Sequence, residues 1–215
     1  MHSKPFEDTI LAELPYWPSV SYLAKITIHK RLLLEKCEHF VKSSNRNRCF
    51  ISSANGIQLL TIPIAGGRSH KQPYAETLID QRLPWQRQHW HAIESAYGKS
   101  AFFEYYHPEL KPLYEQSTEK LWEFNEQLLR WLLKKLQIEV EVDYSKSYVK
   151  SIPGLDVRTS KGPHQNELPP YYQVFANKNG FLSDMAGMDL LFNLGPRAAK
   201  AYLLALEQAG MAKID

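Results

Sequence analysis

The N-terminal part of the chain passes from a strand pattern to a helix pattern across one short turn, and this change most constrains its fold. Thr9–Leu14 is an apolar run that predicts a strand, and two prolines then interrupt regular structure. Val20–Ile28 predicts a helix with Ser19 as its N-cap. Many α/β proteins hold an anion or a nucleotide at such a strand–turn–helix start. The turn lacks glycine, so phosphate-cradling fingerprints are absent. It is therefore a rigid structural turn or a ligand wall, with Tyr16 as the candidate contact.

The rest of the chain alternates predicted strands with predicted helices. Asn55-Gly56 supplies the positive backbone angles of a tight turn, which predicts a hairpin around it. Apolar residues at helical spacing predict the helices, and short apolar or alternating runs predict the strands. The predicted strands are Leu32–Leu34, Arg48–Ser52, Gln58–Ile64, Glu76–Asp80 and Ile138–Val142. The predicted helices are Trp85–Gly98, Glu119–Gln137, Met188–Leu194 and Pro196–Gln208.

This order of elements predicts an α/β fold of three layers, with a central mixed sheet flanked by helices. The length of 215 residues is that of one domain, spanning 1–215. Segment 143–170 is polar, and so long an irregular stretch is disordered or a functional lid over one end of the sheet. Its charged residues Asp156, Arg158 and Lys161 are usually solvated in such loops. A lid that closes over an anionic ligand uses the same residue types, so they are candidate substrate contacts.

Composition narrows the class of protein. The hydrophobic content of 44% supports a substantial core, and the net charge of +3 comes from basic residues in small groups. A nucleic-acid-binding face is usually continuous and basic, so we expect no nucleic-acid partner. Cys37 and Cys49 are too few for a disulfide framework and are expected to be buried thiols in a reducing compartment. The sequence has no signal-peptide pattern and no membrane-spanning run, which predicts a cytoplasmic protein without membrane insertion.

The short motif Ser44–Arg48 is the most suggestive chemically. In a strand, Arg46 and Arg48 would point to one face and Asn47 to the other. Two guanidinium groups on one face can grip a phosphate or a carboxylate. Two surface salt bridges explain the same pattern equally well. All three residues are candidate substrate contacts.

His89 lies one helical turn after Trp85 and is the first candidate for acid–base catalysis. A histidine in this position more often hydrogen-bonds to backbone and supports the core. The other histidines show no metal-ligand spacing, Cys-x-x-Cys is absent, and we expect no bound metal. Serine-centred catalysis is not indicated either, because no Gly-x-Ser-x-Gly turn occurs.

The segment Tyr171–Pro196 sets polar side chains into an apolar frame. Such side chains cost free energy unless they are paired, so they usually serve folding or a site. Tyr172 and Gln173 are candidate substrate contacts. Asp189, the second catalytic candidate, shares a helical face with Asn193 four residues later, and the two are expected to be linked to each other or to a helix terminus.

Five blocks of the sequence together resemble the bacterial WbqC-like protein family, from about Leu11 to Leu203. They are LPYWPSVSYLAKI (14–26), EHFVKSSNRNRCFI (38–51), NGIQLLTIPI (55–64), WQRQHWHAIESAYGKSAFFEYYHPEL (85–110), and YYQVFANKNGFLSDMAGMDLLFNLGP (171–196), the last preceded by DVRTSK (156–161). The chain departs from the family at Leu14, where many members have Gln, and at Ser183 and Asp184. Asp189 and Asn193 stay in register.

The resemblance implies a place in O-antigen or other surface-polysaccharide pathways. It favours an enzyme that transfers an acyl or aminoacyl group to an anionic small molecule, such as a nucleotide-linked amino sugar. The sequence leaves the cofactor open, and association into a homo-oligomer is a further open expectation. The alternative is a non-catalytic binding or scaffold protein of the same pathway. Exposed aromatic residues would supply its partner surface, with Tyr105, Tyr106, Tyr171 and Tyr172 as the candidates.

Overall fold

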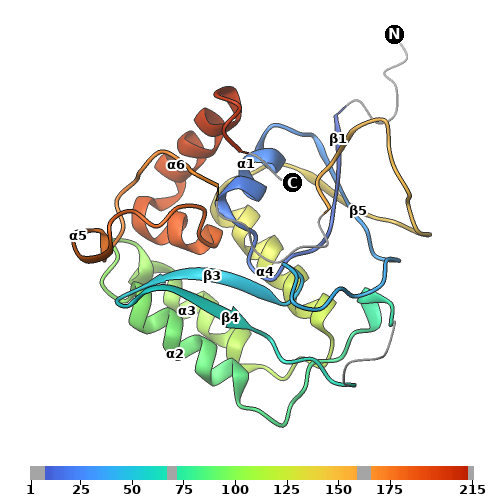
Figure 1. Ribbon diagram of the computed structural model, residues 1–215, viewed down its shortest axis with the longest axis horizontal. Coiled ribbons are helices and arrows are strands. Elements are labelled where there is room, and N and C mark those ends of the chain that lie inside the picture. The colour runs from blue at the N-terminus through green and yellow to red at the C-terminus, as the bar shows by residue number, and fades with distance from the viewer. Residues whose placement is uncertain (1–7, 67–71, 159–165, 213–215) are drawn as a thin grey trace.

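The main sheet has four parallel strands in the order β5-β2-β1-β6. The computed structural model describes residues 8–66, 72–158 and 166–212. The strands are β1 (Thr9–Ala12), β2 (Arg31–Leu34), β5 (Glu141–Tyr144) and the two-residue β6 (Leu155–Asp156). All four residues of β1 are buried, as expected for a central parallel strand covered on both faces. The sheet stands beside the helices α1, α4 and α6 in Figure 1.

Two antiparallel strands form a separate sheet. Strand β3 (Arg48–Ser53) pairs with β4 (Gly56–Thr61), and Gly56 in the turn has a φ of 95°. The hairpin predicted around Asn55-Gly56 is therefore confirmed. The α/β class is also confirmed, and the parallel and antiparallel strands occupy different sheets rather than one. Helix α2 (Trp85–Tyr97) lies alongside this hairpin (Figure 1).

Three helices fill the space next to the parallel sheet. They are α1 (Val20–Thr27), α4 (Leu121–Lys135) and α6 (Gly187–Gln208). Ser19 caps α1, as predicted, by accepting a hydrogen bond from the backbone N–H of Tyr22. Helix α6 is the two helices predicted on either side of position 195, joined across a break where Gly195 has a φ of 73°. In Figure 1, α1 and α4 lie between the strands and α6.

Helix α3 and the range 76–80 differ most from the prediction. Helix α3 (Phe103–Glu115) was not anticipated, because it contains Pro108 and Pro112, which lack the N–H that an α-helix needs. Both prolines lie on its exposed side. The predicted strand Glu76–Asp80 is wrong. A 3-10 helix (Tyr74–Glu76) forms at the start of this range instead, and Leu78 and Ile79 then form isolated β-bridges but no strand.

The remaining elements complete the C-terminal half. The strand predicted at Ile138–Val142 is observed as β5, shifted to Glu141–Tyr144. Strand β6 forms inside the segment 143–170 and pairs with β1. The short helix α5 (Ala176–Asn179) precedes α6 and ends at a glycine, Gly180, with a φ of 70°.

Candidate functional site

The carboxyl ends of the parallel strands form the candidate site. Along the chain, β2 and then β5 are added on one side of β1. The chain then returns and adds β6 on the other side of β1, so the order of the strands reverses between β1 and β6. Ligands of open α/β sheets bind outside the carboxyl ends of the strands at such a reversal. Two buried acidic residues follow the strands at this edge, Glu13 after β1 and Glu35 after β2.

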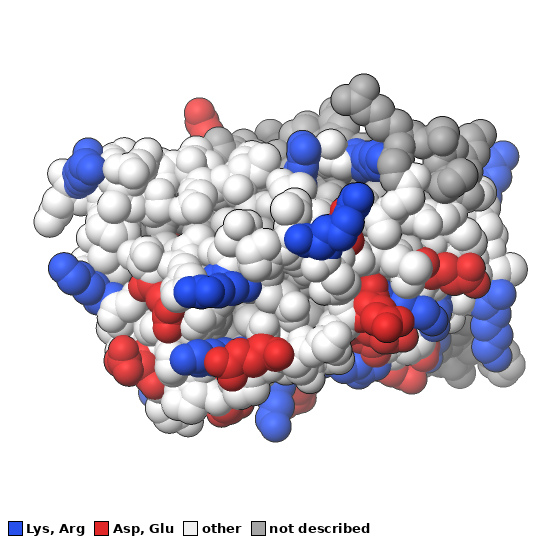
Figure 2. Space-filling view, turned by 90° about the horizontal axis from the view of Figure 1, so that it is seen from below, with Lys and Arg blue, Asp and Glu red and all other residues white. Residues whose placement is uncertain are grey.

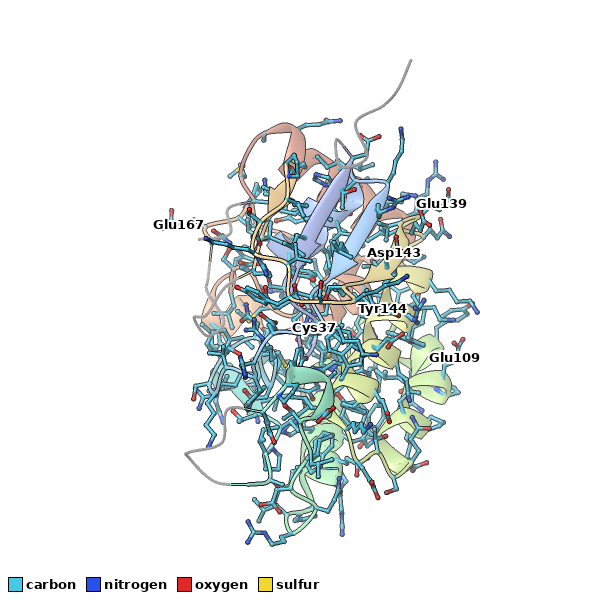
Figure 3. All side chains as sticks on the ribbon, turned by 90° about the vertical axis from the view of Figure 1, so that its right-hand side faces the viewer. Cys37, Glu109, Glu139, Asp143, Tyr144 and Glu167 are labelled. Carbon is cyan, nitrogen blue, oxygen red and sulfur yellow. The ribbon has the colours of Figure 1, made fainter. Side chains whose placement is uncertain are left out.

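Glu35 organises the edge through its carboxylate. Oε1 accepts hydrogen bonds from the backbone N–H of Cys37 at 2.8 Å and from Ser145 Oγ at 2.6 Å. Oε2 accepts one from the backbone N–H of Val149 at 2.7 Å. Figure 3 labels Cys37 and Tyr144, the last residue of β5, at this edge of the sheet. Cys37 is exposed, so the prediction that it is buried is wrong, whereas Cys49 is buried. Cys37 follows the strand end at the surface instead of lying inside β2.

Arg158 ties the segment after β5 to this edge. It donates from Nε and Nη2 to the Asp156 carboxylate at 3.0 and 2.7 Å and from Nη1 to the carbonyl of Val149 at 2.7 Å. The same guanidinium lies 3.7 Å from Glu35 Oε2. Asp156 and Arg158 are therefore part of the described edge. The third loop candidate, Lys161, lies outside the described residues.

Arg46 has a different position from the one predicted. Strand β3 begins only at Arg48, and Arg46 belongs to the preceding turn, where its N–H donates to Ser44 Oγ. Its guanidinium pairs with Glu38, and the side chain is 2% exposed. Burial raises the pKa of the Glu38 carboxyl above its usual range, and Arg46 offsets only part of that effect. Arg46 and Arg48 therefore do not share one strand face, and their binding of an anion stays a prediction.

Asn47 is also held from inside the protein. Its Nδ2 donates to the carbonyl of Ile62 at 3.0 Å, which fastens the turn before β3 to the end of β4.

The charges of Arg46 and Arg158 both act on the Glu38 carboxyl, as does the charge of Glu35. The structure thus brings two of the predicted cations, Arg46 and Arg158, to the same end of the sheet.

Tyr16 and His89 meet in a buried hydrogen-bonded network. The Tyr16 hydroxyl lies 2.8 Å from His89 Nδ1 and 3.0 Å from the Tyr114 hydroxyl. Trp17 Nε1, which can only donate, reaches the Tyr114 hydroxyl at 2.7 Å. Every donor finds an acceptor if Tyr114 donates to Tyr16 and Tyr16 donates to His89. His89 then carries its proton on Nε2.

Burial holds His89 neutral. Desolvation lowers the pKa of its imidazole to about 4, and a hydrogen bond to the Thr61 backbone opposes this only in part. The neutral imidazole is hydrogen-bonded to Tyr16 and to the Thr61 backbone, and it thereby holds the turn that contains Tyr16 in place. The geometry thus favours the supporting role for His89 that the sequence left open, and its catalytic role stays a prediction.

Asp189 forms a second buried cluster. Its Oδ2 accepts hydrogen bonds from the Tyr171 hydroxyl at 2.5 Å and from Gln173 Nε2 at 2.8 Å. Gln173 also binds the backbone of Leu182 through both ends of its amide. Burial raises the pKa of the Asp189 carboxyl to about 6. Asn193 Nδ2 donates to the Asp189 carbonyl at 2.8 Å, which confirms the expected link.

Tyr172 is set apart from this cluster, because its side chain is 63% exposed. The structure therefore separates the predicted residues into three places. Arg46, Asp156 and Arg158 gather at the edge of the sheet. Tyr16 and His89 lie in the aromatic core, and Gln173 and Asp189 lie at the start of α6.

Sequence reasoning missed the buried carboxylates Glu13, Glu35 and Glu38, and it assigned no role to Asp184, which is also buried. Asp184 accepts hydrogen bonds from the Ser21 N–H and hydroxyl at 2.8 and 2.7 Å, at the first turn of α1. It also accepts from Asn166 Nδ2 at 2.8 Å. One signal was available in the sequence, because Glu35 directly follows the predicted strand Leu32–Leu34 and Glu13 is the charged residue near the end of the predicted strand Thr9–Leu14.

Among residues 8–66, 72–158 and 166–212, no three His, Cys, Asp or Glu side chains are grouped so that they could hold a metal ion. Across the same ranges, no helix is long and apolar enough to span a membrane.

Comparison with known proteins supports the family resemblance. The model of the WbqC-like protein family matches residues 15–157. The chain is also similar to the uncharacterized protein Rv1507c of Mycobacterium tuberculosis, with 31% identity over 135 residues. That alignment covers 62% of this chain and 58% of the relative, so it spans little more than half of the relative's length. No solved structure matches the chain.

Proposed function

The chain belongs to the WbqC-like protein family, and on that premise we propose that it is a cytoplasmic enzyme of bacterial surface-polysaccharide biosynthesis. Its substrate is an anionic small molecule, a nucleotide-linked or otherwise phosphorylated amino sugar. The reaction joins the sugar's amino nitrogen to the carbonyl carbon of an acyl or aminoacyl donor. The bond from that carbon to the donor's leaving group breaks, and a base takes the proton that the amine loses.

The carboxyl edge of the parallel sheet carries this proposal. Glu35 and Arg158 bind the segment 145–158 across the edge by hydrogen bonds to backbone and side chains. Arg158 is bound by acidic groups that an incoming phosphate can replace, because a guanidinium pairs with phosphate and carboxylate in the same bidentate geometry. Arg48 and Lys161 are further candidate contacts of the anionic group. Asp189 and His89 remain the candidates for proton transfer, and His89 is linked to the turn after β1 through Tyr16.

A thermal-shift titration with UDP, UDP-N-acetylglucosamine and inorganic phosphate tests the anion site. We expect UDP-N-acetylglucosamine to raise the Tm of the wild type in a saturable way. Arg158→Ala should remove this shift. Arg82→Ala is a matched control, because Arg82 pairs with Asp80 two residues before it just as Arg158 pairs with Asp156. Equal shifts in both variants would contradict the proposal.

The second candidate is a non-catalytic binding protein of the same pathway. Tyr105 and Tyr172 are 71% and 63% exposed, as expected, and Tyr148 is 61% exposed. Tyr106 and Tyr171 are buried, so the expectation that they are exposed is wrong. Exposed aromatic residues are enriched at protein interfaces. Mass spectrometry of a mixture of the protein, an acyl-coenzyme A and a nucleotide-linked amino sugar separates the two functions. An acylated sugar supports the enzyme, whereas saturable binding without product supports the binding protein.

A further inference from the structure

A cavity lies at the surface where the start of α3, the last turn of α4 and the break in α6 meet. It has a volume of about 330 Å³, at the lower end of the roughly 300–1,000 Å³ that ligand pockets occupy. None of the residues proposed above as contacts of the substrate lines it. The cavity is therefore a separate candidate for a small ligand.

One wall of the cavity is apolar and accessible. Tyr105 is 71% exposed, so most of its ring can meet a ligand, and Phe102 is only partly buried. The Phe102 ring packs directly on Gly195, where a Cβ would lie 2.5 Å from Phe102 Cζ. The Phe102 N–H donates to the carbonyl of Phe192 at 3.0 Å, which holds the start of α3 against α6. The apolar wall thus has a fixed place beside the cavity.

The opposite wall is the last turn of α4, and it is cationic. Lys135 is paired with Glu109 at 2.6 Å, so its charge is already balanced. Lys134 is exposed, and within the described part of the chain its ammonium group has no hydrogen-bonded or ion-paired partner. The pKa of the Glu109 carboxyl is lowered chiefly by the hydrogen bond from Lys135 and only weakly by the charge of Lys134.

Lysines in the last turn of a helix commonly interact with its free carbonyl groups. At the end of α4 these carbonyl groups have other partners. The carbonyl of Leu133 accepts from the Ile138 N–H at 2.9 Å. The carbonyl of Lys134 itself accepts from the Gln137 N–H at 3.2 Å. The carbonyl of Gln137 accepts from Lys200 Nζ at 2.5 Å. The Lys134 ammonium group is therefore available to a ligand.

The sign of the charge in the cavity selects the class of ligand. Figure 2, seen from the side of α2, shows basic and acidic side chains next to one another on that face. By contrast, the described residues that line the cavity include two lysines and no carboxylate. One unpaired cation beside an apolar wall complements a single negative charge on an apolar body. A phosphate dianion would bring a second charge that finds no unpaired cation and is repelled by Glu109.

We propose that this cavity binds a small aromatic carboxylate. The flat ring packs on Tyr105 and Phe102, and one carboxylate oxygen accepts from the Lys134 ammonium group. The other oxygen can accept from the side-chain amide of Gln137, which also lines the cavity.

This site is independent of the sheet edge. Asn125, in the first half of α4, donates to the carbonyl of Arg46 at 2.7 Å. Lys134 and Lys135 end the same helix, and Lys135 lies about 15 Å further along its axis at about 1.5 Å per residue. The inference therefore goes beyond the proposed function and does not depend on it.

The test is a titration followed by backbone amide signals in ¹H–¹⁵N NMR spectra. The probes are 2-naphthoate, its neutral isostere 2-naphthamide, acetate and inorganic phosphate. We expect 2-naphthoate to shift the signals of residues 102–106 and 134–137 in a saturable way. The amide lacks the charge and should bind about tenfold more weakly, as expected for the loss of one charge-assisted hydrogen bond. Acetate and phosphate lack the ring and should not saturate the same signals.

Two exposed side chains locate the binding, and each has a matched control. Lys134→Gln keeps the length of the side chain but removes its charge, and it should weaken 2-naphthoate binding about tenfold. Lys111→Gln is its control, because Lys111 is an exposed lysine of α3 that lies outside the cavity lining. Tyr105→Ala should weaken binding about fivefold. Tyr148→Ala is the control for it, since Tyr148 is 61% exposed and is not part of the lining.

Three results would overturn the proposal. They are no saturable shift at residues 102–106 and 134–137 with 2-naphthoate, equal affinities for 2-naphthoate and 2-naphthamide, and equal weakening by Lys134→Gln and Lys111→Gln. Arg158→Ala should leave 2-naphthoate binding unchanged, because Arg158 lies at the sheet edge. Failure at the sheet edge is thereby distinguished from failure in the cavity.

Discussion

The guanidinium of Arg46 donates two hydrogen bonds to one oxygen of Glu38, from Nε at 2.8 Å and from Nη2 at 2.6 Å. Glu38 and Arg46 both lie in the connection between β2 and β3, and both are buried. Arg46 also stacks near the ring of Tyr74, 5.8 Å from its centroid, and its carbonyl accepts from Asn125. The pair thus joins the β2–β3 connection to α4 and stabilises the end of the sheet.

Arg46→Ala should destabilise the protein by about 3–5 kcal/mol, because it leaves the Glu38 carboxylate buried without this partner. Urea unfolding followed by circular dichroism measures the loss. The loss should be smaller at pH 5 than at pH 8, since burial raises the pKa of Glu38 and the unpaired carboxyl can take up a proton.

The double variant Glu38→Leu/Arg46→Met is the control for charge burial. It removes both charges and keeps apolar volume, so it should recover most of the stability lost by Arg46→Ala. If the double variant is no more stable than Arg46→Ala, the ion pair is not what the single substitution breaks.

His89 should remain neutral far below the ordinary histidine range. Its imidazole should titrate with a pKa of about 4, and it should carry its proton on Nε2, because Nδ1 accepts from Tyr16. Long-range ¹H–¹⁵N NMR spectra of the imidazoles report both properties. Tyr16→Phe is the matched perturbation, which removes the donor to Nδ1 and should change the Nδ1 shift. A His89 that titrates near 6.5 would refute the buried network as described.

Asp189 should make the protein less stable as the pH rises from about 4 to about 6. Its folded-state pKa of about 6 exceeds the ordinary value of 3.8, so the native state binds more protons in this window and loses stability as they leave. Two pKa units correspond to on the order of 3 kcal/mol. Urea unfolding at intervals between pH 4 and 7 measures the slope.

Asp189→Asn isolates this contribution. The amide keeps an oxygen that can accept from Tyr171 and Gln173 but cannot ionise. His89 acts in the opposite direction, because its lowered pKa removes stability as the pH falls, and this contribution is common to both proteins. The stability of the wild type relative to Asp189→Asn should therefore fall between pH 4 and 6. A constant difference would show that the carboxyl titrates normally.

Gly187→Ala should cost about 1–3 kcal/mol through overpacking. A Cβ on Gly187 would lie 2.2 Å from Leu23 Cδ1 and 3.0 Å from Leu132 Cδ2, where α6 begins against α1. Thermal unfolding checks the loss. In a double-mutant cycle, Leu23→Ala should cost less in the Gly187→Ala background than alone, because it removes the clashing methyl. Additive effects would mean that the two positions do not meet.

The elements with a strong local signal could be predicted from the sequence. The Asn55-Gly56 hairpin, the Ser19 cap of α1 and the apolar stripe of α4 follow from neighbouring residues alone. Helix α3 could not, because its two prolines oppose the helix and only tertiary contacts of Phe103, Tyr106 and Leu110 with the core offset them. The two-residue β6 has no signal of its own, since it exists only by pairing with β1.

For the candidate site, too, some properties follow from the sequence and others only from the tertiary structure. The types and chain positions of Arg46, His89, Asp156, Arg158 and Asp189 are properties of the sequence, as is the strand–turn–helix start that contains Tyr16. The tertiary structure alone decided their partners, because hydrogen bonds such as Tyr16–His89 and Glu35–Val149 join residues far apart in the chain. Burial, which raises the pKa of Asp189 and lowers that of His89, depends on the whole fold. Sequence therefore fixes which groups are available, and packing fixes which of them are neutral, paired or open to a ligand.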